Sequence, residues 1–359
     1  MSDTQTSIVQ NRSEIIFIFD AVDTNPNGDP KSAGNRPRID PETGQCIVTD
    51  VRLKRYLRDQ LADDGHGVYI RRVDDEDGDR YTREQLLADR LDEIDPENID
   101  SDDLADAVFA EFLDASSDVR YFGATLSVDG DEQYVQHLPD HFTGPVQFSP
   151  GKSMHPVELN ENYSSLSSVI ATQDDKQGGG FDLDDHRVQY AAISMHGIVD
   201  ENNAADTHLS TADVERLDTL CWRALKNQTN TRSKAGQEPR VYVRVEYEED
   251  SYHIGGLHHD ISIDEDRSEP FNELRNIRDL AFDATDFVSR LESHQDSIKT
   301  VNIVVDDVAQ FSVGDEIGNG DFLIAMLEES LGAEKINEVD VLGEFEETLP
   351  EEPSATAEA

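Results

Sequence analysis

Apolar residues recur along this chain in patterns that predict a protein of mixed α and β structure. Runs of apolar or alternating residues predict strands, because successive side chains of a strand point to opposite faces. These runs occupy residues 14–22, 68–73, 120–128, 145–148, 187–199, 241–247, 252–254, 261–263 and 300–305. Apolar residues at helical spacing predict helices at 49–62, 82–91, 101–113, 210–227 and 272–291. This order of elements favours an α+β fold with one sheet, helices on one face and long insertions.

The helix predicted at 49–62 carries two cations within its apolar arc. Thr49 or Asp50 is a suitable N-cap for it. On a helical wheel the apolar arc contains Val51, Leu53, Leu57 and Leu61. Lys54 and Arg58 fall within the same arc, whereas Arg52 and Arg55 point elsewhere. The two inward cations either extend past the edge of the core to reach water or line a groove that holds an anion such as phosphate.

The composition is strongly acidic. The chain has 359 residues, of which 78 are acidic and 30 basic, and its formal net charge is −48. Repulsion of this size strains a compact state in dilute salt, whereas molar salt screens it because the Debye length falls to ~3 Å. The strand-like apolar runs argue against disorder of the whole chain. The composition therefore predicts the surface of a protein from a halophile.

Composition also excludes several classes of protein. No segment approaches the ~18 consecutive apolar residues of a membrane-spanning helix. The first twelve residues are polar, so we expect no secretion signal and a cytoplasmic location. Two cysteines, Cys46 and Cys221, are too few for a disulfide framework or a cysteine-rich zinc site. A soluble globular protein remains.

The charge is distributed unevenly along the chain. Residues 74–118 contain 18 acidic and 3 basic residues, and residues 315–359 contain 14 and 1. By contrast, residues 31–58 contain 7 basic and 3 acidic residues, and residues 223–244 contain 6 and 1. The two positive segments either pair with carboxylates of the protein or line a site for an anion. Basic clusters are the usual electrostatic footprint of nucleic-acid binding.

Two loops contain residues suited to a phosphate backbone. The loop after the first predicted strand contains Asn25, Asn27, Gly28, Lys31, Asn35, Arg36 and Arg38. The segment after the helix predicted at 210–227 contains Arg232, Ser233, Lys234 and Arg240. Small, amide and basic residues allow hydrogen-bond donors to approach phosphate closely. An ordinary turn or a solvated loop remains the alternative for each.

Patterns for catalysis or metal binding are weak. Asp20, Asp23 and Asp29 lie near one loop, but carboxylates are frequent throughout this chain. The glycines at 178–180 predict a flexible loop within 160–185, and no P-loop lysine follows them. A His-His-Asp sequence at 258–260 lacks further ligands at metal-binding spacing. We therefore expect no catalytic residue, no metal site and no cofactor.

Several motifs resemble the backbone subunit of type I CRISPR Cascade complexes, in the RAMP superfamily and closest to the type I-B and I-C kind. They are 25–30 (NPNGDP), 37–40 (PRID) with 43–44 (TG), 48–55 (VTDVRLKR), 118–123 (DVRYFG), 144–148 (GPVQF), 152–157 (KSMHPV) and 231–234 (TRSK) with 239–240 (PR). Together they extend over most of the chain to about residue 264. The N-terminal motifs are the most specific of the set.

The resemblance implies an α+β fold with an RRM-like (ferredoxin-like) palm, a helical fingers insertion and a flexible thumb. The palm would comprise residues 1–73, 119–163 and 186–310, the fingers 74–118 and the thumb loop 164–185. We expect residues 311–349 to form an acidic C-terminal helical segment and residues 350–359 a disordered tail.

The resemblance also implies a function. The chain would be a CRISPR RNA-binding backbone subunit of a type I-B Cascade interference complex in antiviral defence. Several copies would coat the guide RNA in a helical filament and present it for pairing with target DNA. Other implied partners are the small backbone-capping, large and RNA-processing subunits of Cascade. Type I backbone subunits are not nucleases, so no enzymatic activity is implied; a metal-dependent RNA nuclease of the same superfamily and a general single-strand binder are the alternatives.

The expected RNA-binding residues combine the two positive segments with the motifs of the resemblance. They are Asn25, Asn27, Lys31, Arg36, Arg38, Lys54, Arg55, Arg58, Gln147, Lys152, Ser153, His155, Arg232, Lys234 and Arg240. If the arc of the first helix faces a groove, replacing Lys54 or Arg58 with alanine will release more RNA than replacing Arg55.

Overall fold

A sheet of nine strands organises the chain. The computed structural model describes residues 7–28, 35–74, 80–94, 104–126, 138–160, 166–168, 181–183, 186–228, 234–343 and 349. The strand order is β17-β14-β11-β1-β10-β7-β3-β2, and β6 also pairs with β10. The bounds are β1 Ser13–Thr24, β2 Arg38–Ile39, β3 Gln45–Val48, β6 Val146–Phe148, β7 Gly151–Pro156, β10 Val188–Val199, β11 Gln237–Tyr247, β14 Ile298–Val305 and β17 Ile336–Glu338.

The central strand β1 explains why one stretch of the sequence is apolar without alternation. It pairs antiparallel with β10 on one side and β11 on the other, and Phe17 lies opposite Met195 and Tyr242. Residues 13–21 of β1 are all buried. A strand that is covered on both faces needs apolar side chains on both. Strands β1, β10, β11 and β14 confirm four of the predicted strands.

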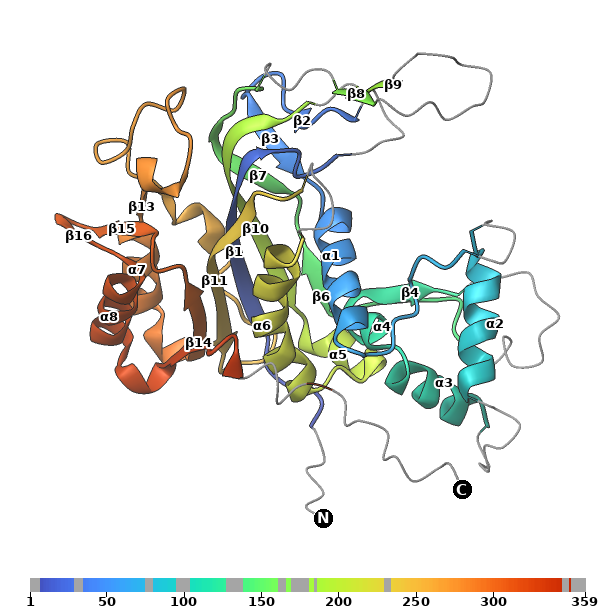
Figure 1. Cartoon of the computed structure of the whole chain (residues 1–359). Coiled ribbons are helices and arrows are strands. Elements are labelled where there is room, and N and C mark those ends of the chain that lie inside the picture. Colours follow the sequence, from blue (N-terminus) through green and yellow to red (C-terminus); the bar gives the residue numbers. More distant parts are fainter. Residues whose placement is uncertain are drawn as a thin grey trace.

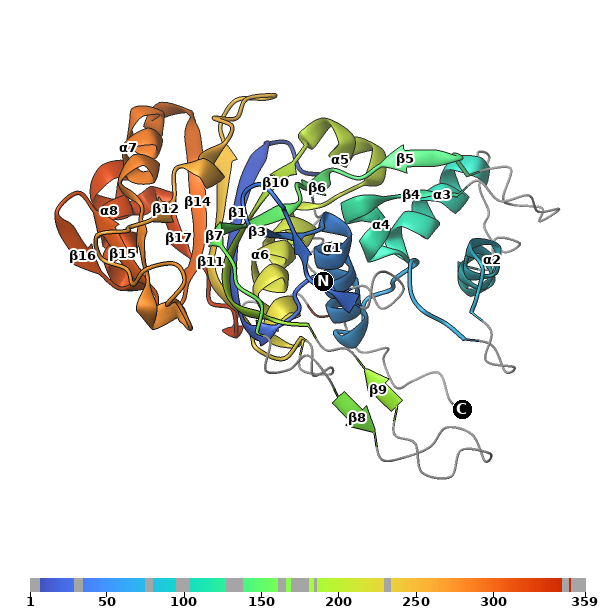
Figure 2. The same ribbon diagram turned by 90° about the horizontal axis from the view of Figure 1, so that it is seen from above.

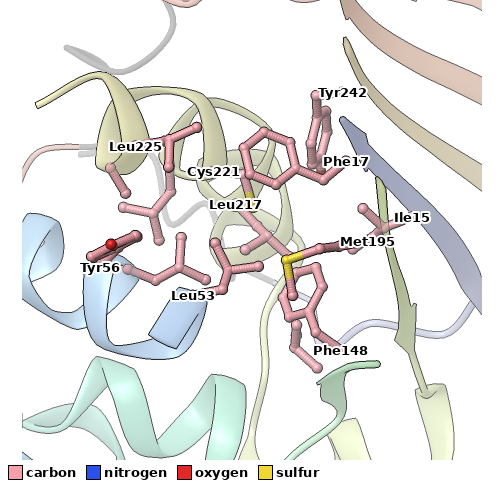
Figure 3. Close-up of a cluster of buried hydrophobic side chains, with 14 of the residues drawn as sticks. Ile15, Phe17, Leu53, Tyr56, Phe148, Met195, Leu217, Cys221, Leu225 and Tyr242 are labelled. Atoms are coloured by element: carbon pink, nitrogen blue, oxygen red, sulfur yellow. The ribbon is translucent and has the colours of Figure 1, made fainter. Parts of the chain in front are cut away.

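Helices α1 (Asp50–Asp63) and α6 (Thr211–Lys226) cover one face of the sheet (Figure 1). Their apolar sides meet Phe17 and Met195 in the first core (Figure 3). The helix α6 begins after its N-cap, Ser210, which forms a capping box with Asp213. The shorter helices α4 (Ser117–Phe122) and α5 (Glu201–Thr207) lie nearby. Both cysteines are buried in this core, and neither forms a disulfide.

A C-terminal lobe covers the other face of the sheet (Figure 1). It contains β12 Ser262–Ile263, β13 Ala281–Asp283, β15 Gln310–Val313, β16 Glu316–Gly318, α7 Thr285–Ser293 and α8 Gly320–Leu331. Ile16 and Val243 of the large sheet pack with Phe282, Phe311 and Leu327 of the lobe in the second core. The central strands are therefore enclosed between two layers.

The acidic insertion forms a separate small core. Its helices α2 (Arg83–Ile94) and α3 (Leu104–Asp114) confirm the two helices predicted there. Leu87 and Phe112 pack with Tyr69, and β4 (Gly123–Thr125) pairs with β5 (His141–Thr143) beside them. Elsewhere, β8 (Leu166–Ser168) pairs antiparallel with β9 (Phe181–Leu183) within the expected thumb, and Figure 2 shows this pair apart from the larger sheets.

Some predicted elements are wrong because local side chains take the backbone hydrogen bonds. Residues 68–73 form no strand, because the N–H groups of Tyr69 and Ile70 donate to the Asp118 carboxylate at 2.7 and 3.2 Å. The predicted helix at 272–291 is divided into a 3₁₀ turn (Ile277–Asp279), β13 and α7. Asn276 and Asp279 cap that turn reciprocally and so interrupt the helix.

Other corrections concern the bounds of predicted strands and the number of sheets. Residues 120–122 belong to α4, and the strand predicted at 120–128 begins at β4. Residues 252–254 form no strand, since the chain then turns through Gly255 and Gly256 at positive φ. The α+β class is confirmed, but the described chain contains four sheets where one was predicted.

The C-terminal part differs from a purely helical segment. Residues 311–349 contain α8 together with most of β15 and all of β16 and β17, and β17 pairs in parallel with β14. The expected tail at 350–359 and most of the expected thumb lie outside the described residues. None of the helices in the described ranges is long and apolar enough to span a membrane.

Candidate nucleic-acid interface

The loop after β1 is held against the start of α1 by its amide side chains. The Asn27 side-chain oxygen accepts from the backbone N–H and the hydroxyl of Thr49, at 3.0 and 2.9 Å. Thr49 is the N-cap, but its own side chain makes no capping bond. Asn25 is buried and donates to the carbonyl of Asn35. These two amides therefore shape the loop from within.

Lys54 and Arg58 lie on one flank of α1, against groups of the same chain. Lys54 donates to the Gln147 side-chain oxygen at 2.8 Å and lies 3.5 Å from the Asp50 carboxylate. Both cations lie over the ring of Phe122, at 5.7 and 5.0 Å from its centre. Burial lowers the pKa of Lys54, and the charge of Arg58 adds to this effect. Their predicted position beside the buried face is confirmed, and Gln147 lies with them.

The apolar arc of α1 is narrower than predicted. Its buried residues are Leu53, Tyr56, Leu57, Gln60 and Leu61. Val51 is 70% exposed, so its place in the predicted arc is wrong. The helix turns by about 100° per residue, which places Val51 beyond the edge of the layer that contacts the sheet.

Arg58 has a structural partner. Its Nε donates at 2.8 Å to Asp118, whose side chain is fully buried. The same carboxylate accepts from the backbone N–H groups of residues 69 and 70, shortly before the acidic insertion at 74–118. Arg58 therefore neutralises a buried anion that fixes the insertion to α1.

The opposite flank of α1 carries a set of cations that we call the α1 basic cluster, consisting of Arg52, Arg55 and Lys234. Arg52 and Lys234 lie 5.9 and 5.1 Å from the centre of the Tyr56 ring. Arg52 also donates to the carbonyl of Gly28. Arg55 donates to the Asp59 carboxylate at 3.0 Å. The cluster joins the loop after β1 to the segment before β11.

Several cations act on one another in the α1 basic cluster, although the chain as a whole is acidic. Burial and the neighbouring charges of Arg52, Arg72 and Arg55, against the opposing effect of Asp59, together lower the pKa of Lys234 to about 8. A lowered lysine pKa beside three arginines indicates cations that are incompletely neutralised. Such a place suits a phosphate.

Two expected site residues on β7 hold strands together. The hydroxyl of Ser153, which is buried, accepts from the Cys46 N–H at 2.8 Å and donates to the His155 carbonyl at 2.6 Å. His155 is also buried, and its Nε2 accepts from the Ala192 N–H at 3.3 Å. Its ring stacks on Tyr190 with 5.7 Å between ring centres. Burial lowers the pKa of His155, which favours the neutral ring.

The remaining expected residues divide between exposed and buried positions. Arg36, Arg38 and Lys152 are exposed at the edge formed by β2, β3 and β7, and Arg36 donates to His186 at 3.2 Å. Arg240 is largely buried, 3.1 Å from Asp20 and 3.0 Å from Asp306. Lys31 and Arg232 lie outside the described residues.

Asp20 and Arg240 form a buried ion pair. Burial raises the pKa of Asp20 to about 6, and the charge of Arg240 opposes this rise. Asp20 lies on β1 and Arg240 on the neighbouring strand β11. Because the aspartate is fully buried, the arginine serves to neutralise it.

Sequence reasoning missed Arg52 and Arg72 as members of the positive region. Both are cationic, but Arg52 was set aside because it points away from the apolar arc. The available signal was the pairing of Arg52 with Tyr56, four residues later and on the same side of the helix. Tyr56 is itself buried, so its ring orients the part-exposed cations beside it and is not a platform for a base.

Of the aspartates considered for catalysis, Asp23 is held by a contact within the chain. Asp23 accepts from the Asn160 side chain at 2.6 Å and adopts a positive φ of 46°. Asp29 lies outside the described residues. Within the described ranges, no three His, Cys, Asp or Glu residues are grouped so that they could hold a metal ion.

Comparisons with known proteins agree with the resemblance seen in the sequence. The family model "CRISPR-associated protein Cas7" matches residues 11–285. A relative named CRISPR-associated protein Cas7, from Haloferax volcanii, is 50% identical over 345 residues, which cover 93% of this chain and 98% of the relative.

Two solved structures also match. A chain of "CRISPR RNA-guided surveillance complex, pre-nicking" is 13% identical with a TM-score of 0.43, covering 89% of this chain and 100% of its own length. A chain of "CRISPR RNA-guided surveillance complex" is 12% identical with the same TM-score, covering 82% and 88%. On the family match and the relative, which extend over most of its length, the chain belongs to the CRISPR-associated Cas7 family.

Proposed function

We propose that this chain is the backbone subunit of a type I-B CRISPR surveillance complex in the cytoplasm, where several copies coat the guide RNA. The observation that carries the proposal is 50% identity to a Cas7 protein along almost its whole length. The copies would present the guide for pairing with target DNA, alongside the small, large and RNA-processing subunits. The subunit would have no enzymatic activity of its own.

The order of elements supports an RRM-like palm. In chain order β1, α1, β7, β10, α6 and β11 alternate as in a ferredoxin-like fold, and their strands lie in the sheet order β11-β1-β10-β7. Many RRM domains stack bases on the open face of the sheet. Here the C-terminal lobe covers that face, so an RNA path beside the α1 basic cluster and the β2 edge is favoured instead.

The insertions support the remaining parts of the proposal. Helices α2 and α3 would form the fingers, and the β8–β9 pair would belong to a thumb that reaches a neighbouring copy. Release of counterions contributes little at molar salt, because nucleic-acid affinity falls with the logarithm of salt concentration. Direct hydrogen bonds, stacking and contacts between copies would therefore hold the RNA, and binding would be cooperative and persist at ~2 M KCl.

Purification of the tagged chain from its native host in ~2 M KCl tests this function. We expect co-purified RNA of uniform length, with CRISPR spacers flanked by repeat fragments and several protein copies per RNA. RNA of unrelated sequence and length would contradict guide binding and favour a general single-strand binder. Metal-dependent cleavage of RNA that is lost in Asp23→Asn would contradict the non-enzymatic role.

The pKa of Lys234 predicts a pH dependence of RNA affinity. This pKa is lowered to about 8, so the side chain loses its proton as pH rises through 8. A bound phosphate restores the ordinary pKa, so RNA affinity should fall about tenfold between pH 7 and pH 9. Titrations of RNA-free protein with labelled guide RNA at fixed KCl would measure this fall. Lys234→Arg is the matched control, because arginine stays charged and should give a flat profile; a fall of equal size in that variant would exclude Lys234 as its cause.

A further inference from the structure

A cavity of about 460 Å³ lies between the edge of the large sheet and the C-terminal lobe. Residues of β3, β7 and β10 form one wall, and the 3₁₀ turn Leu257–His259 and β12 form the other. Its volume is within the roughly 300–1,000 Å³ of small-molecule sites. The α1 basic cluster lies with the first core, whereas this cavity adjoins the second. The two sites therefore lie on different faces of the sheet.

The cavity lacks acidic side chains. None of the described residues that line it is Asp or Glu, although 78 of the 359 residues of the chain are acidic. Lys152 lies at the wall and is exposed, and the described residues include no salt-bridge partner for it. The carboxylate that acts on Lys152 is Asp40, on the segment that follows β2. Because the lining has one cation and no carboxylate of its own, the surface next to Lys152 suits an anionic group; the ionised Glu14 lies behind His196.

Three imidazole rings are packed together at the cavity. The ring centres of His258 and His259 are 3.9 Å apart, and those of His258 and His196 are 4.7 Å apart. Burial, together with the two neighbouring histidines, lowers the pKa of His258 to about 4, so its ring is neutral near pH 7. Histidine rings are among the planar groups on which nucleobases stack.

Buried polar atoms at the cavity have unused hydrogen-bonding capacity. Among the described residues, the Ser194 hydroxyl and the His258 Nδ1 find no hydrogen-bond partner, although both atoms are shielded from solvent. Ser194 on β10 is the register partner of Lys152 on β7, so a hydroxyl and a cation share one wall. Buried polar groups without partners are uncommon, and each of these two would bond the edge of a base only after its side chain turns toward the cavity.

The cavity wall is fixed by a buried carboxylate. Glu14 accepts from His196 Nε2 at 2.9 Å and from the backbone N–H groups of Gly255 and Leu257 at 2.9 and 3.1 Å. Burial raises the pKa of Glu14, but these hydrogen bonds outweigh that effect, and the pKa is lowered to about 2. The carboxylate therefore stays ionised at neutral pH and holds the 3₁₀ turn against β10. A wall held in this way is formed before any ligand arrives.

We propose that this cavity binds one nucleotide unit, with the base against His258 and His259 and the phosphate at Lys152. The inference goes beyond the proposed function, because it assigns a second site on the other face of the sheet. The shared chemistry is a nucleobase joined to a phosphate. The unit comes either from an RNA strand or from a free mononucleotide.

Equilibrium binding of AMP to the full-length chain, freed of RNA and held in ~2 M KCl, tests the site. We expect saturable binding of AMP, with adenosine and ribose 5-phosphate each binding at least tenfold more weakly. His258→Ala should weaken AMP about tenfold through loss of stacking. His258→Phe keeps a ring and should retain more affinity than the alanine variant. Lys152→Gln should reduce the binding of AMP while leaving that of adenosine unchanged.

Control variants distinguish AMP binding at this cavity from guide-RNA binding at the α1 basic cluster. Lys226→Gln removes an exposed lysine from α6 and should leave AMP binding unchanged. Arg52→Ala/Arg55→Ala/Lys234→Ala should retain AMP binding even if guide RNA is lost. Displacement of AMP by guide RNA would identify the RNA strand as the source, and the absence of displacement a free nucleotide. Absence of saturable AMP binding, or equal binding by the wild type, His258→Ala and Lys152→Gln, would overturn the proposal.

Discussion

Arg240→Ala lowers the free energy of unfolding by about 3–5 kcal/mol, because it leaves the carboxylate of Asp20 buried without its counter-charge. The loss should depend on pH. The pKa of Asp20 is already raised from 3.8 to about 6 in the folded protein, so this group contributes most to stability when it is protonated. Its contribution falls as pH rises above about 4, and without Arg240 the fall extends to higher pH. Denaturant unfolding in ~2 M KCl, followed by the fluorescence of the single tryptophan, Trp222, measures both effects.

The double variant Asp20→Asn/Arg240→Ala is the control for this ion pair. Removing both charges leaves no buried anion, so the double variant should regain part of the lost stability. Arg240 was expected from the sequence to bind RNA. If Arg240→Ala unfolds at the same denaturant concentration as the wild type but loses RNA, then that role is correct and the ion pair is unimportant.

Removing the α1 basic cluster should have the largest effect on RNA. The variant Arg52→Ala/Arg55→Ala/Lys234→Ala deletes three cations that share one flank of α1. If each contacts one phosphate, then the slope of the logarithm of affinity against the logarithm of salt concentration becomes shallower by about 2. Affinity should also fall more than tenfold at a fixed KCl concentration. Titration of labelled guide RNA over a series of KCl concentrations gives both quantities.

A matched variant controls for net charge. Arg267→Ala/Arg275→Ala/Arg278→Ala removes three exposed cations from the C-terminal lobe, on the other face of the sheet. It should leave the salt slope unchanged, and an equal change in both variants would show that only total charge matters. Arg58→Ala tests the earlier expectation for the inward cations. Since Arg58 neutralises Asp118, we now expect this variant to lose stability first and RNA only as a consequence.

The sequence predicts those helices and strands whose apolar pattern continues without interruption over many consecutive residues. The strand β1 and the helix α6 were both found because their apolar pattern persists over more than two turns or over a whole strand. The helix expected at 272–291 failed because one capping pair, Asn276 and Asp279, interrupts an otherwise suitable pattern. The periodicity of apolar residues carries no information about a hydrogen bond between two polar side chains.

The site was predicted less completely, and the reason is electrostatic. Sequence reasoning brought the loop after β1, α1 and the segment around Lys234 into one region, and the structure agrees. It could not tell which cations are neutralised within the chain. Arg58 pairs with Asp118, and Arg240 with Asp20, far away in sequence. With 78 carboxylates available, the partner of a given arginine is fixed only by the tertiary fold.

The pairing of β1 also has a consequence for synthesis of the chain. The strand partners of Phe17 are Met195 and Tyr242. Strand β1 therefore cannot pair on both sides until most of the chain has left the ribosome. At about 5–20 residues per second, β1 remains an unpaired apolar segment for roughly ten seconds or longer. Unpaired strands invite association with other chains. The acidic insertion at residues 74–118 is made before these partners and repels the insertions of neighbouring nascent chains, so the acidic charge also reduces association while β1 is unpaired.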